Sequence, residues 1–247
     1  MRRVALITGA SSGIGAETAR LLARRDWDIA LHYGANRAGA EGVAADCAAA
    51  GARTALIAAD LADPAAPAGL FAAFDAAFPR LNALVANAGI VDRPARVAEM
   101  TPDRLMRMFT VNTVAAFLCA GAAARRMSRA AGGAGGAIVL VSSVAARLGS
   151  GGLYTDYAAS KAALDTLAKG LSDEVAPEGV RVVSLRPGVI DTDIHAKGGL
   201  PDRVQAMAPF VPLRRIGTAA EIAEAIRWLI EDATYVTGTT LDATGGR

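Results

Sequence analysis

Short apolar runs alternate along the chain with longer alanine-rich stretches of helical character. This alternation is typical of repeated strand–helix units built on a parallel sheet. Several runs are apolar throughout, as strands buried on both faces should be. The pattern predicts an α/β fold, a doubly wound sheet of about seven parallel strands with helices on both faces. The predicted strands are Val4–Thr8, Asp28–Tyr33, Thr54–Ala59, Ala83–Ala86, Ala137–Val141, Arg181–Leu185 and Thr239–Asp242.

Helix start signals lie between the predicted strands, as the alternation of strands and helices requires. Asp63-Pro64 and Thr101-Pro102 each place a capping residue before a proline suited to a first turn, and Thr218 with Glu221 forms a capping box. The glycine-rich run 132–136 is expected to be a tight connection between a helix and a strand. A chain of 247 residues without a linker is expected to fold as a single domain, 1–247.

Composition and charge narrow the possible partners. Hydrophobic residues make up 53% of the chain, and the net charge is only +2, without basic runs interleaved with aromatics. A nucleic-acid partner is therefore not expected. Cys47 and Cys119 are isolated, and His32 and His195 are the only histidines, so neither a metal site nor a disulfide framework is predicted.

The first residues are basic and then apolar, like the opening of a signal peptide. The apolar run breaks after four residues, at Thr8-Gly9, and no later stretch reaches the roughly 18–20 uninterrupted apolar residues of a membrane span. The sequence therefore predicts a cytoplasmic protein that does not bind membranes.

A glycine-rich turn follows the first predicted strand and leads into a helix. Glycines let the backbone approach a pyrophosphate, and the helix that follows offers unpaired N–H groups and the positive end of its dipole. The spacing is G-x-x-x-G-x-G, a variant of the common dinucleotide fingerprint. The predicted contacts are Gly9, Ser11, Ser12, Gly13, Ile14 and Gly15.

Tyr157 and Lys161 lie four residues apart, a spacing that places both side chains on one face of a helix. A nearby cation favours the phenolate and can lower the pKa of a tyrosine by roughly 1–3 units. The pair is a candidate acid–base catalyst, although the same spacing alone also occurs on solvated helix faces.

The glycine loop, this pair and the order of the other motifs together resemble the short-chain dehydrogenase/reductase family along the whole chain. The resemblance implies a Rossmann-type fold, a nicotinamide cofactor and transfer of a hydride between the cofactor and a carbonyl or alcohol. It implies that Ser143 orients the substrate oxygen, Tyr157 delivers the proton and Lys161 contacts the nicotinamide ribose. Asn112 matches the family's helix asparagine, which supports proton return to the lysine through water. The further family motifs are Asn87-Ala88-Gly89, Pro187-Gly188 and Thr192.

Cofactor preference should depend on the end of the second strand, where a carboxylate would accept from the ribose 2′-hydroxyl. No carboxylate is present there, and Asn36-Arg37 offers a permanently charged donor suited to a phosphate. We therefore expect NADP(H) to be preferred, with NAD(H) possible. Asp60 and Leu61, after the third strand, match positions near the adenine, although Asp60 is equally suited to capping a helix.

The substrate is less defined. The resemblance places a lid at about 191–215, and the stretch between Ser143 and Tyr157 carries one residue more than the common family spacing. Within the family, the chain resembles the bacterial 3-oxoacyl-carrier-protein reductases and the sugar 1-dehydrogenases about equally well. A possible docking site for an acidic carrier protein consists of Arg125, Arg126 and Arg129.

The alanine-rich surface of the Tyr157 helix would permit close helix packing, and the resemblance implies a homotetramer. An alternative of another class is a non-catalytic NADP(H)-binding sensor or scaffold. The intact Ser143, Tyr157 and Lys161 argue for an enzyme, because a pure binder has no use for a tuned phenol.

Overall fold

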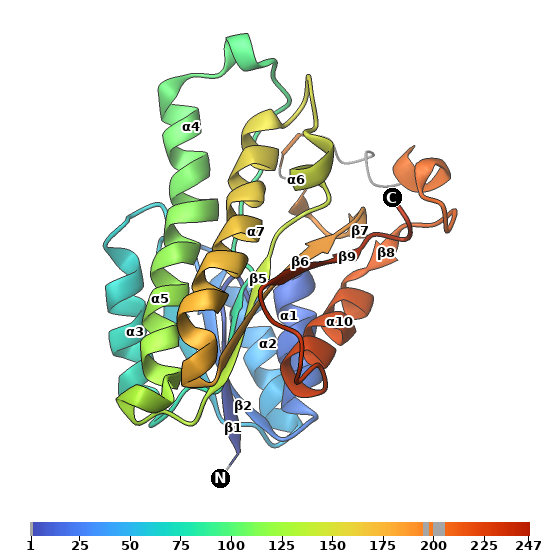
Figure 1. The fold of residues 1–247 in the computed structure, drawn as a ribbon. Coiled ribbons are helices and arrows are strands. Elements are labelled where there is room, and N and C mark those ends of the chain that lie inside the picture. The colour runs from blue at the N-terminus through green and yellow to red at the C-terminus, as the bar shows by residue number, and fades with distance from the viewer. Residues whose placement is uncertain (1, 195–197, 200–205) are drawn as a thin grey trace.

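The computed structural model describes residues 2–194, 198–199 and 206–247, and its main feature is a seven-stranded parallel sheet (Figure 1). The strand order is β3-β2-β1-β4-β5-β6-β9, so the order reverses between β1 and β4. The α/β prediction is confirmed, and every predicted strand is present within two residues at each end. The strands are β1 Arg3–Ile7, β2 Trp27–Tyr33, β3 Thr54–Ala58, β4 Ala83–Ala86, β5 Gly136–Val141, β6 Val180–Pro187 and β9 Thr239–Ala243.

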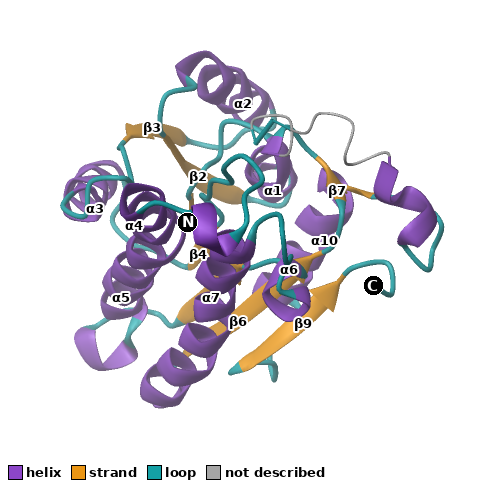
Figure 2. Ribbon diagram, turned by 90° about the horizontal axis from the view of Figure 1, so that it is seen from above, coloured by secondary structure: helices purple, strands orange, loops and turns teal. Residues whose placement is uncertain are grey.

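Helices cover both faces of the sheet (Figure 2). Alternate strand residues supply the two cores: Val4 and Leu6 of β1 belong to one apolar cluster, and Ala5 and Ile7 to the other. The first cluster includes residues of α3, α5 and α7, and the second includes residues of α1, α2 and α10. The helices are α1 Gly13–Ala23, α2 Arg37–Ala49, α3 Ala66–Ala77, α4 Pro102–Phe109, α5 Ala115–Met127, α6 Ala145–Leu148, α7 Thr155–Val175 and α10 Ala219–Glu231.

Two of the three predicted helix starts have the expected capping contacts. Thr101 accepts a hydrogen bond from the Arg104 N–H, and Thr218 and Glu221 form a reciprocal capping box at α10. The start predicted at Asp63-Pro64 is wrong, because α3 begins at Ala66. The Asp63 carboxylate instead accepts the Ala65 N–H at 2.8 Å, so it closes the turn before the helix.

A second, two-stranded sheet, β7 Ile190–Asp191 with β8 Gly217–Thr218, was not predicted. Strands of two residues are too short to produce a periodic pattern. This small sheet joins the ends of the segment predicted as a lid, since Ile190 pairs with Gly217 and Asp191 with Thr218.

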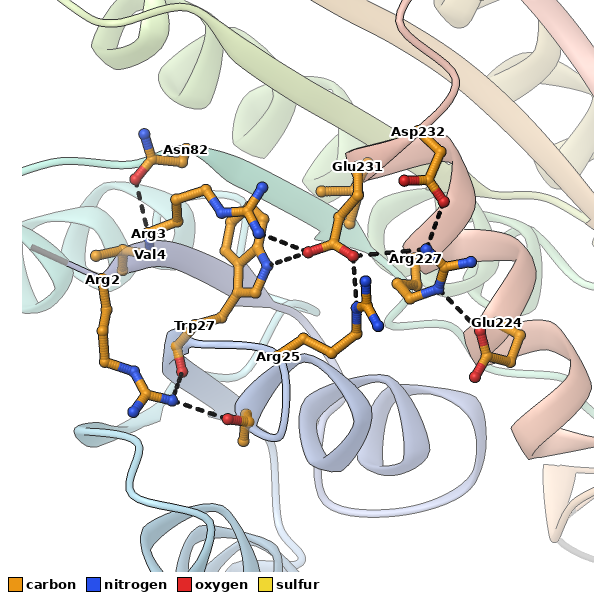
Figure 3. A network of polar contacts seen from close by, with 12 residues as sticks. Arg2, Arg3, Val4, Arg25, Trp27, Asn82, Glu224, Arg227, Glu231 and Asp232 are labelled. Atoms are coloured by element: carbon orange, nitrogen blue, oxygen red, sulfur yellow. Dashed lines mark hydrogen bonds and ion pairs between the residues drawn. The ribbon is translucent and has the colours of Figure 1, made fainter.

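A network of ion pairs ties the end of α10 to the beginning of the sheet (Figure 3). The Glu231 side chain is only 6% exposed and lies 2.6 Å from the guanidinium groups of both Arg3 and Arg25. It also accepts the Trp27 indole N–H at 2.9 Å. These contacts satisfy a buried carboxylate and fix the C-terminal helix against β1 and β2, far from the carboxyl ends of the strands.

One described helical stretch, Pro102–Met127, is long and apolar enough to cross a membrane by length and composition alone. Its most apolar window is 44% buried in the protein. The stretch runs through α4 and α5 and packs against α7 and β4, as a core helix does. The predicted cytoplasmic location stays a prediction.

Candidate active site

The loops after β1 and β4 separate where the strand order reverses, and an open cleft lies at this point. The cleft holds about 600 Å³ and adjoins a cavity of about 140 Å³, with which it shares Ile14, Asn87, Gly89, Thr192 and Ile194. Predicted cofactor residues that line the cleft are Gly9, Ser11, Ser12, Gly13, Ile14, Asn36, Asp60, Leu61, Asn87, Ala88, Gly89 and Thr192. Predicted residues that line the cavity include Ser143, Tyr157, Lys161, Pro187 and Gly188.

The glycine loop depends on the absence of side chains. Gly9 and Gly13 have positive φ values, +66° and +55°, which most other residues rarely adopt. A Cβ atom on Gly15 would lie 2.4 Å from the Gly9 carbonyl oxygen, so α1 can approach the loop only with glycine there. The Ser12 side chain caps none of the described backbone N–H groups at the start of α1. The loop therefore fits the phosphates of a dinucleotide.

Thr8 and Asn87 join the two loops that flank the cleft. The Thr8 Oγ1 accepts the backbone N–H groups of Asn87 and Ala88 at 2.9 and 3.0 Å. The Asn87 Nδ2 donates to the carbonyls of Thr8 and Gly9 at 2.9 and 3.2 Å. The Asn87-Ala88-Gly89 motif thus holds the glycine loop in place from the neighbouring strand.

Thr192 closes the cleft from the other side. A Cβ atom on Gly13 would lie 3.3 Å from the Thr192 Cγ2, so the segment after β6 lies directly over the glycine loop. Gly188 lets the backbone after β6 lie close to the backbone after β9, because a Cβ atom on Gly188 would lie 2.7 Å from the Thr244 Cα. The fold therefore places Thr192 where cleft and cavity meet, and Pro187-Gly188 in the lining of the cavity.

His32 is a cleft residue that the sequence analysis considered only as a metal ligand. Its side chain comes from β2, lines the cleft and contacts the glycine loop, with the Gly9 N–H donating to its Nδ1 at 3.1 Å. Its Nε2 lies 3.0 Å from the Ala59 carbonyl oxygen. The sequence signal was a polar residue near the end of a mainly apolar strand.

The end of β5 and the start of α7 bring the catalytic candidates together. Ser143 and Tyr157 form a side-chain hydrogen bond. The Lys161 ammonium lies 6.0 Å from the centroid of the Tyr157 ring and donates to the Val141 carbonyl at 2.8 Å. The hydroxyl of the neighbouring Ser142 donates to the Lys161 carbonyl at 2.9 Å. Ser142 therefore fastens β5 to α7, and Ser143 faces the cavity with Tyr157.

The pKa of Tyr157 differs from the prediction. Burial raises the pKa of its phenol, and the hydrogen bond with Ser143 offsets only part of that rise. Burial also lowers the pKa of Lys161 to about 8, against the opposing effect of Asp165 one turn further along α7. The predicted lowering of the tyrosine pKa by Lys161 is therefore not found in this structure. The phenol stays protonated at neutral pH, the form that can donate a proton.

Asn112 lies behind the cavity, in a single π turn, Thr110–Val114, between α4 and α5. Its Oδ1 accepts the Ile90 N–H at 2.8 Å, and its Nδ2 donates to the Ile90 carbonyl and to the Ser160 Oγ. A Cβ atom on Gly89 would lie 3.1 Å from the Lys161 Nζ and 3.3 Å from the Asn112 Oδ1. Gly89 therefore allows the Asn112 amide to lie near the lysine.

Arg37 lies at the start of α2 and is not among the described residues that line the cleft. Its side chain is 74% exposed and pairs with Glu41 at 2.8 Å. Asn36 caps α2 through the Gly39 N–H and donates to the Ser11 carbonyl at 3.4 Å. Asn36 thus connects the glycine loop to α2, and Arg37 follows it at the edge of the cleft.

A tight turn forms the rim of the cavity between Ser143 and Tyr157. After α6 ends, Gly149, Ser150 and Gly152 have φ values of +76°, +49° and +73°. This turn leaves Ser143 and Tyr157 hydrogen-bonded to each other, and Tyr154 lines the cavity.

Only part of the predicted lid is described, because 195–197 and 200–205 lie outside the described residues, His195 among them. Met207 lines the cavity.

The arginines suggested for carrier docking, Arg125, Arg126 and Arg129, lie near the amino end of β5, where the Gly135 N–H bonds to the Met127 carbonyl. Ser143 follows the opposite end of this strand. Arg126 forms an ion pair with Asp75. This placement does not support carrier docking beside the cavity.

A family model described as short chain dehydrogenase matches residues 3–200 of the chain. The chain belongs to the short-chain dehydrogenase family. It is 46% identical, over 99% of both chains, to an uncharacterized oxidoreductase of Escherichia coli, YgfF. It is 38% identical to a cis-4-hydroxycyclohexanecarboxylate dehydrogenase of Sinomonas cyclohexanicum, over 99% of this chain and 96% of that one.

The crystal structure of a short chain dehydrogenase from Burkholderia cenocepacia in complex with NADP is 33% identical, with a TM-score of 0.90 over 99% of this chain and 97% of that chain. These similarities confirm the predicted family, the Rossmann-type fold and an oxidoreductase that acts on small molecules.

Proposed function

We propose that this oxidoreductase prefers NADP(H) and interconverts a carbonyl and a secondary alcohol, with Tyr157 as the acid or base. The observation that carries the proposal is that Ser143, Tyr157 and Lys161 line one cavity that opens into the glycine-loop cleft. A nicotinamide bound across this junction would supply or accept the hydride.

The protein's own residues manage the proton. Ser143 and Tyr157 are hydrogen-bonded neighbours, so a carbonyl oxygen that replaces the bond between them can accept from both hydroxyls. Tyr157 gives its proton to that oxygen during reduction and takes it back during oxidation. Lys161 lies on the same face of α7 and holds a positive charge near the phenol. Gly89 leaves room for the lysine ammonium and the Asn112 amide on the same side of the loop.

We include the cofactor preference in this proposal. Asn36 faces the glycine loop, and Arg37 is the next residue, held only by an exposed ion pair with Glu41. An exposed pair of this kind is weak, so Arg37 can turn to a 2′-phosphate at little cost. The complex of a related chain with NADP agrees with this preference.

The substrate we propose is a compact ketone or secondary alcohol. The cavity of about 140 Å³ is lined largely by apolar side chains, among them Val144, Leu148, Ile190 and Met207. A relative that is 38% identical over 99% of this chain is named for a hydroxylated cyclohexane carboxylate. Ring-sized carbonyl compounds are therefore the first substrates to screen, ahead of sugars and carrier-bound acyl groups.

We also propose that the chain folds as one domain, 1–247, and that four copies form a homotetramer. Along α5 and the π turn, Val114, Phe117 and Leu118 are 40%, 45% and 44% exposed. An exposed apolar row of this kind supports helix packing between copies. Light scattering coupled to size exclusion is expected to give four times the 25.1 kDa chain mass.

The test of function combines binding with turnover. NADPH and NADH are added at matched concentrations, and the melting temperature is measured, since a ligand at 100 times its Kd stabilises the fold by about 2.7 kcal/mol. We expect a clear rise with NADPH, a smaller one with NADH, and oxidation of NADPH by cyclic ketones. Cofactor binding without turnover of any carbonyl or alcohol would favour the sensor alternative, and no binding would refute the proposal.

A further inference from the structure

The two ring nitrogens of His32 both lie at hydrogen-bond distance from backbone groups. The Gly9 N–H points at Nδ1 from 3.1 Å, and the Ala59 carbonyl lies 3.0 Å from Nε2. An amide N–H can only donate and a carbonyl can only accept. The ring must therefore carry its hydrogen on Nε2 and leave Nδ1 bare, so both bonds require the neutral imidazole.

These bonds hold the start of the dinucleotide loop. Gly9 is the first glycine of the loop and has a φ of +66°. The next residue, Ala10, donates its N–H to the His32 carbonyl at 2.9 Å. The end of β2 thus fixes two successive loop residues, one through its backbone and one through its side chain. A proton on Nδ1 would place two donors against each other and break the Gly9 bond.

The surroundings favour the neutral ring. His32 is only 2% exposed, and burial lowers its pKa below the usual value for histidine. The charged side chains that share its cleft are Asp60, Asp193 and Arg107, among the residues that the structure describes. Asp60 lies after β3 and accepts the Ala62 N–H at 3.0 Å. Burial is the main cause of the lowered His32 pKa, and the contact of the ring with the Ala59 carbonyl opposes it.

We propose that neutral His32 is a positioning residue for the dinucleotide loop and that its protonation weakens cofactor binding in acid. This proposal rests on the proposed cofactor cleft, and it adds a pH dependence that the hydride chemistry does not require.

Two substitutions separate the contacts. In His32→Asn the amide oxygen can occupy the place of Nδ1, accept the Gly9 N–H and never titrate. In His32→Gln the longer amide reaches the place of Nε2 and the Ala59 carbonyl, and the Gly9 N–H loses its partner. The dissociation constants of NADP⁺ and NAD⁺ are measured by calorimetry for the three proteins at pH 7.5 and 5.0. NAD⁺ is included because it lacks the 2′-phosphate, whose own protonation would otherwise contribute to the pH dependence of NADP⁺ binding.

We expect His32→Asn to bind within about threefold of the wild type at pH 7.5 and His32→Gln to bind about tenfold more weakly, the cost of an unpaired donor. From pH 7.5 to 5.0 the wild type is expected to lose at least fivefold more affinity than His32→Asn, with both cofactors. The ¹⁵N spectrum at pH 7.5 is expected to show a protonated Nε2 and an unprotonated Nδ1.

Several results would overturn the inference. Equal acid losses in wild type and His32→Asn would remove the role of protonation, while the proposed function would stand. Equal affinities of His32→Asn and His32→Gln at pH 7.5 would show that the Gly9 bond does not position the loop. If the wild type binds neither cofactor at pH 7.5, the cofactor cleft itself is refuted, and the His32 proposal falls with it.

Discussion

The two walls of the site are built in different ways. The cofactor wall, residues 8–15 with the end of β2, is held by backbone groups and short polar side chains, and its closest approach is between Gly15 and the Gly9 carbonyl. The catalytic wall, the end of β5 with the π turn and the start of α7, contains a buried lysine and a buried ion pair. In that pair Arg104 reaches Asp156 at 2.7 Å, beside Tyr157, and the Asp156 side chain is fully buried.

The difference shows where each wall is vulnerable. Backbone shape specifies the cofactor wall, so an added methyl group there should do more harm than a lost charge. Side-chain chemistry specifies the catalytic wall, so the loss of one hydroxyl should stop turnover while the fold and cofactor binding persist. Four substitutions test this contrast.

The largest effect is expected for Tyr157→Phe on the catalytic wall. Loss of the phenol proton should lower kcat for carbonyl reduction by at least about 1,000-fold, within the range of general acid catalysis. The affinity for NADPH, measured by fluorescence, should change less than about threefold. Tyr235→Phe is the matched control, because Tyr235 is fully exposed on the surface. Substantial activity in Tyr157→Phe would rule out the proposed mechanism.

Gly15→Ala is the corresponding change on the cofactor wall. The new Cβ would lie 2.4 Å from the Gly9 oxygen and 2.7 Å from the Asn87 Nδ2, so the loop must move. We expect a loss of about 1–3 kcal/mol in stability by denaturant unfolding and at least a tenfold weaker Kd for NADP⁺.

Gly42→Ala provides the control for that change, because a Cβ atom on Gly42, within α2, meets no atom within 4 Å. It should stabilise the protein by about 0.5–1 kcal/mol and leave the Kd unchanged. Similar behaviour of the two variants would contradict the close packing of α1 against the loop.

Arg37→Glu tests the effect of charge on the cofactor wall. The NADPH Kd should rise about tenfold and the NADH Kd less than threefold, because only NADPH carries the 2′-phosphate. Stability should stay nearly unchanged, since the Arg37–Glu41 pair is exposed. The control is Glu41→Gln, which frees Arg37 and should preserve NADPH binding. Equal losses for both cofactors would remove the assignment.

The smallest effect is expected for Asp165→Asn, measured as the pH dependence of kcat. Asp165 opposes the lowering of the Lys161 pKa, which lies at about 8. The ammonium predominates below that pH and is lost above it, so activity should fall as the pH rises through about 8. Without the Asp165 carboxylate the pKa of Lys161 drops further, so the fall in kcat should begin up to about one pH unit lower.

At pH 6.5 the rate of Asp165→Asn should stay within about threefold of the wild type, because Lys161 is charged in both proteins. Asp173→Asn, whose carboxylate pairs with Lys169 on the exposed side of α7, is the control and should leave the profile unchanged. Superimposable profiles of Asp165→Asn and the wild type would show that Asp165 does not support the ammonium.

Much of the site could be predicted because its signals are local. The glycines of the loop and the Tyr157–Lys161 spacing occur within single turns, where residue type directly limits backbone shape and side-chain direction. The roles of His32 and Asp165 could not be predicted in the same way. His32 reaches Gly9 across the β1–β2 pairing and Ala59 across the β2–β3 pairing, contacts that require the sheet register.

The sequence by itself determined the order of strands and helices, the glycine loop and the family, because apolar periodicity and turn chemistry act over a few neighbouring residues. Only the tertiary structure decided the protonation states. Burial raises the pKa of Tyr157 and lowers those of Lys161 and His32. These directions follow from how much water and charge the packed elements leave around each group, and that environment exists only after segments far apart in the chain have assembled.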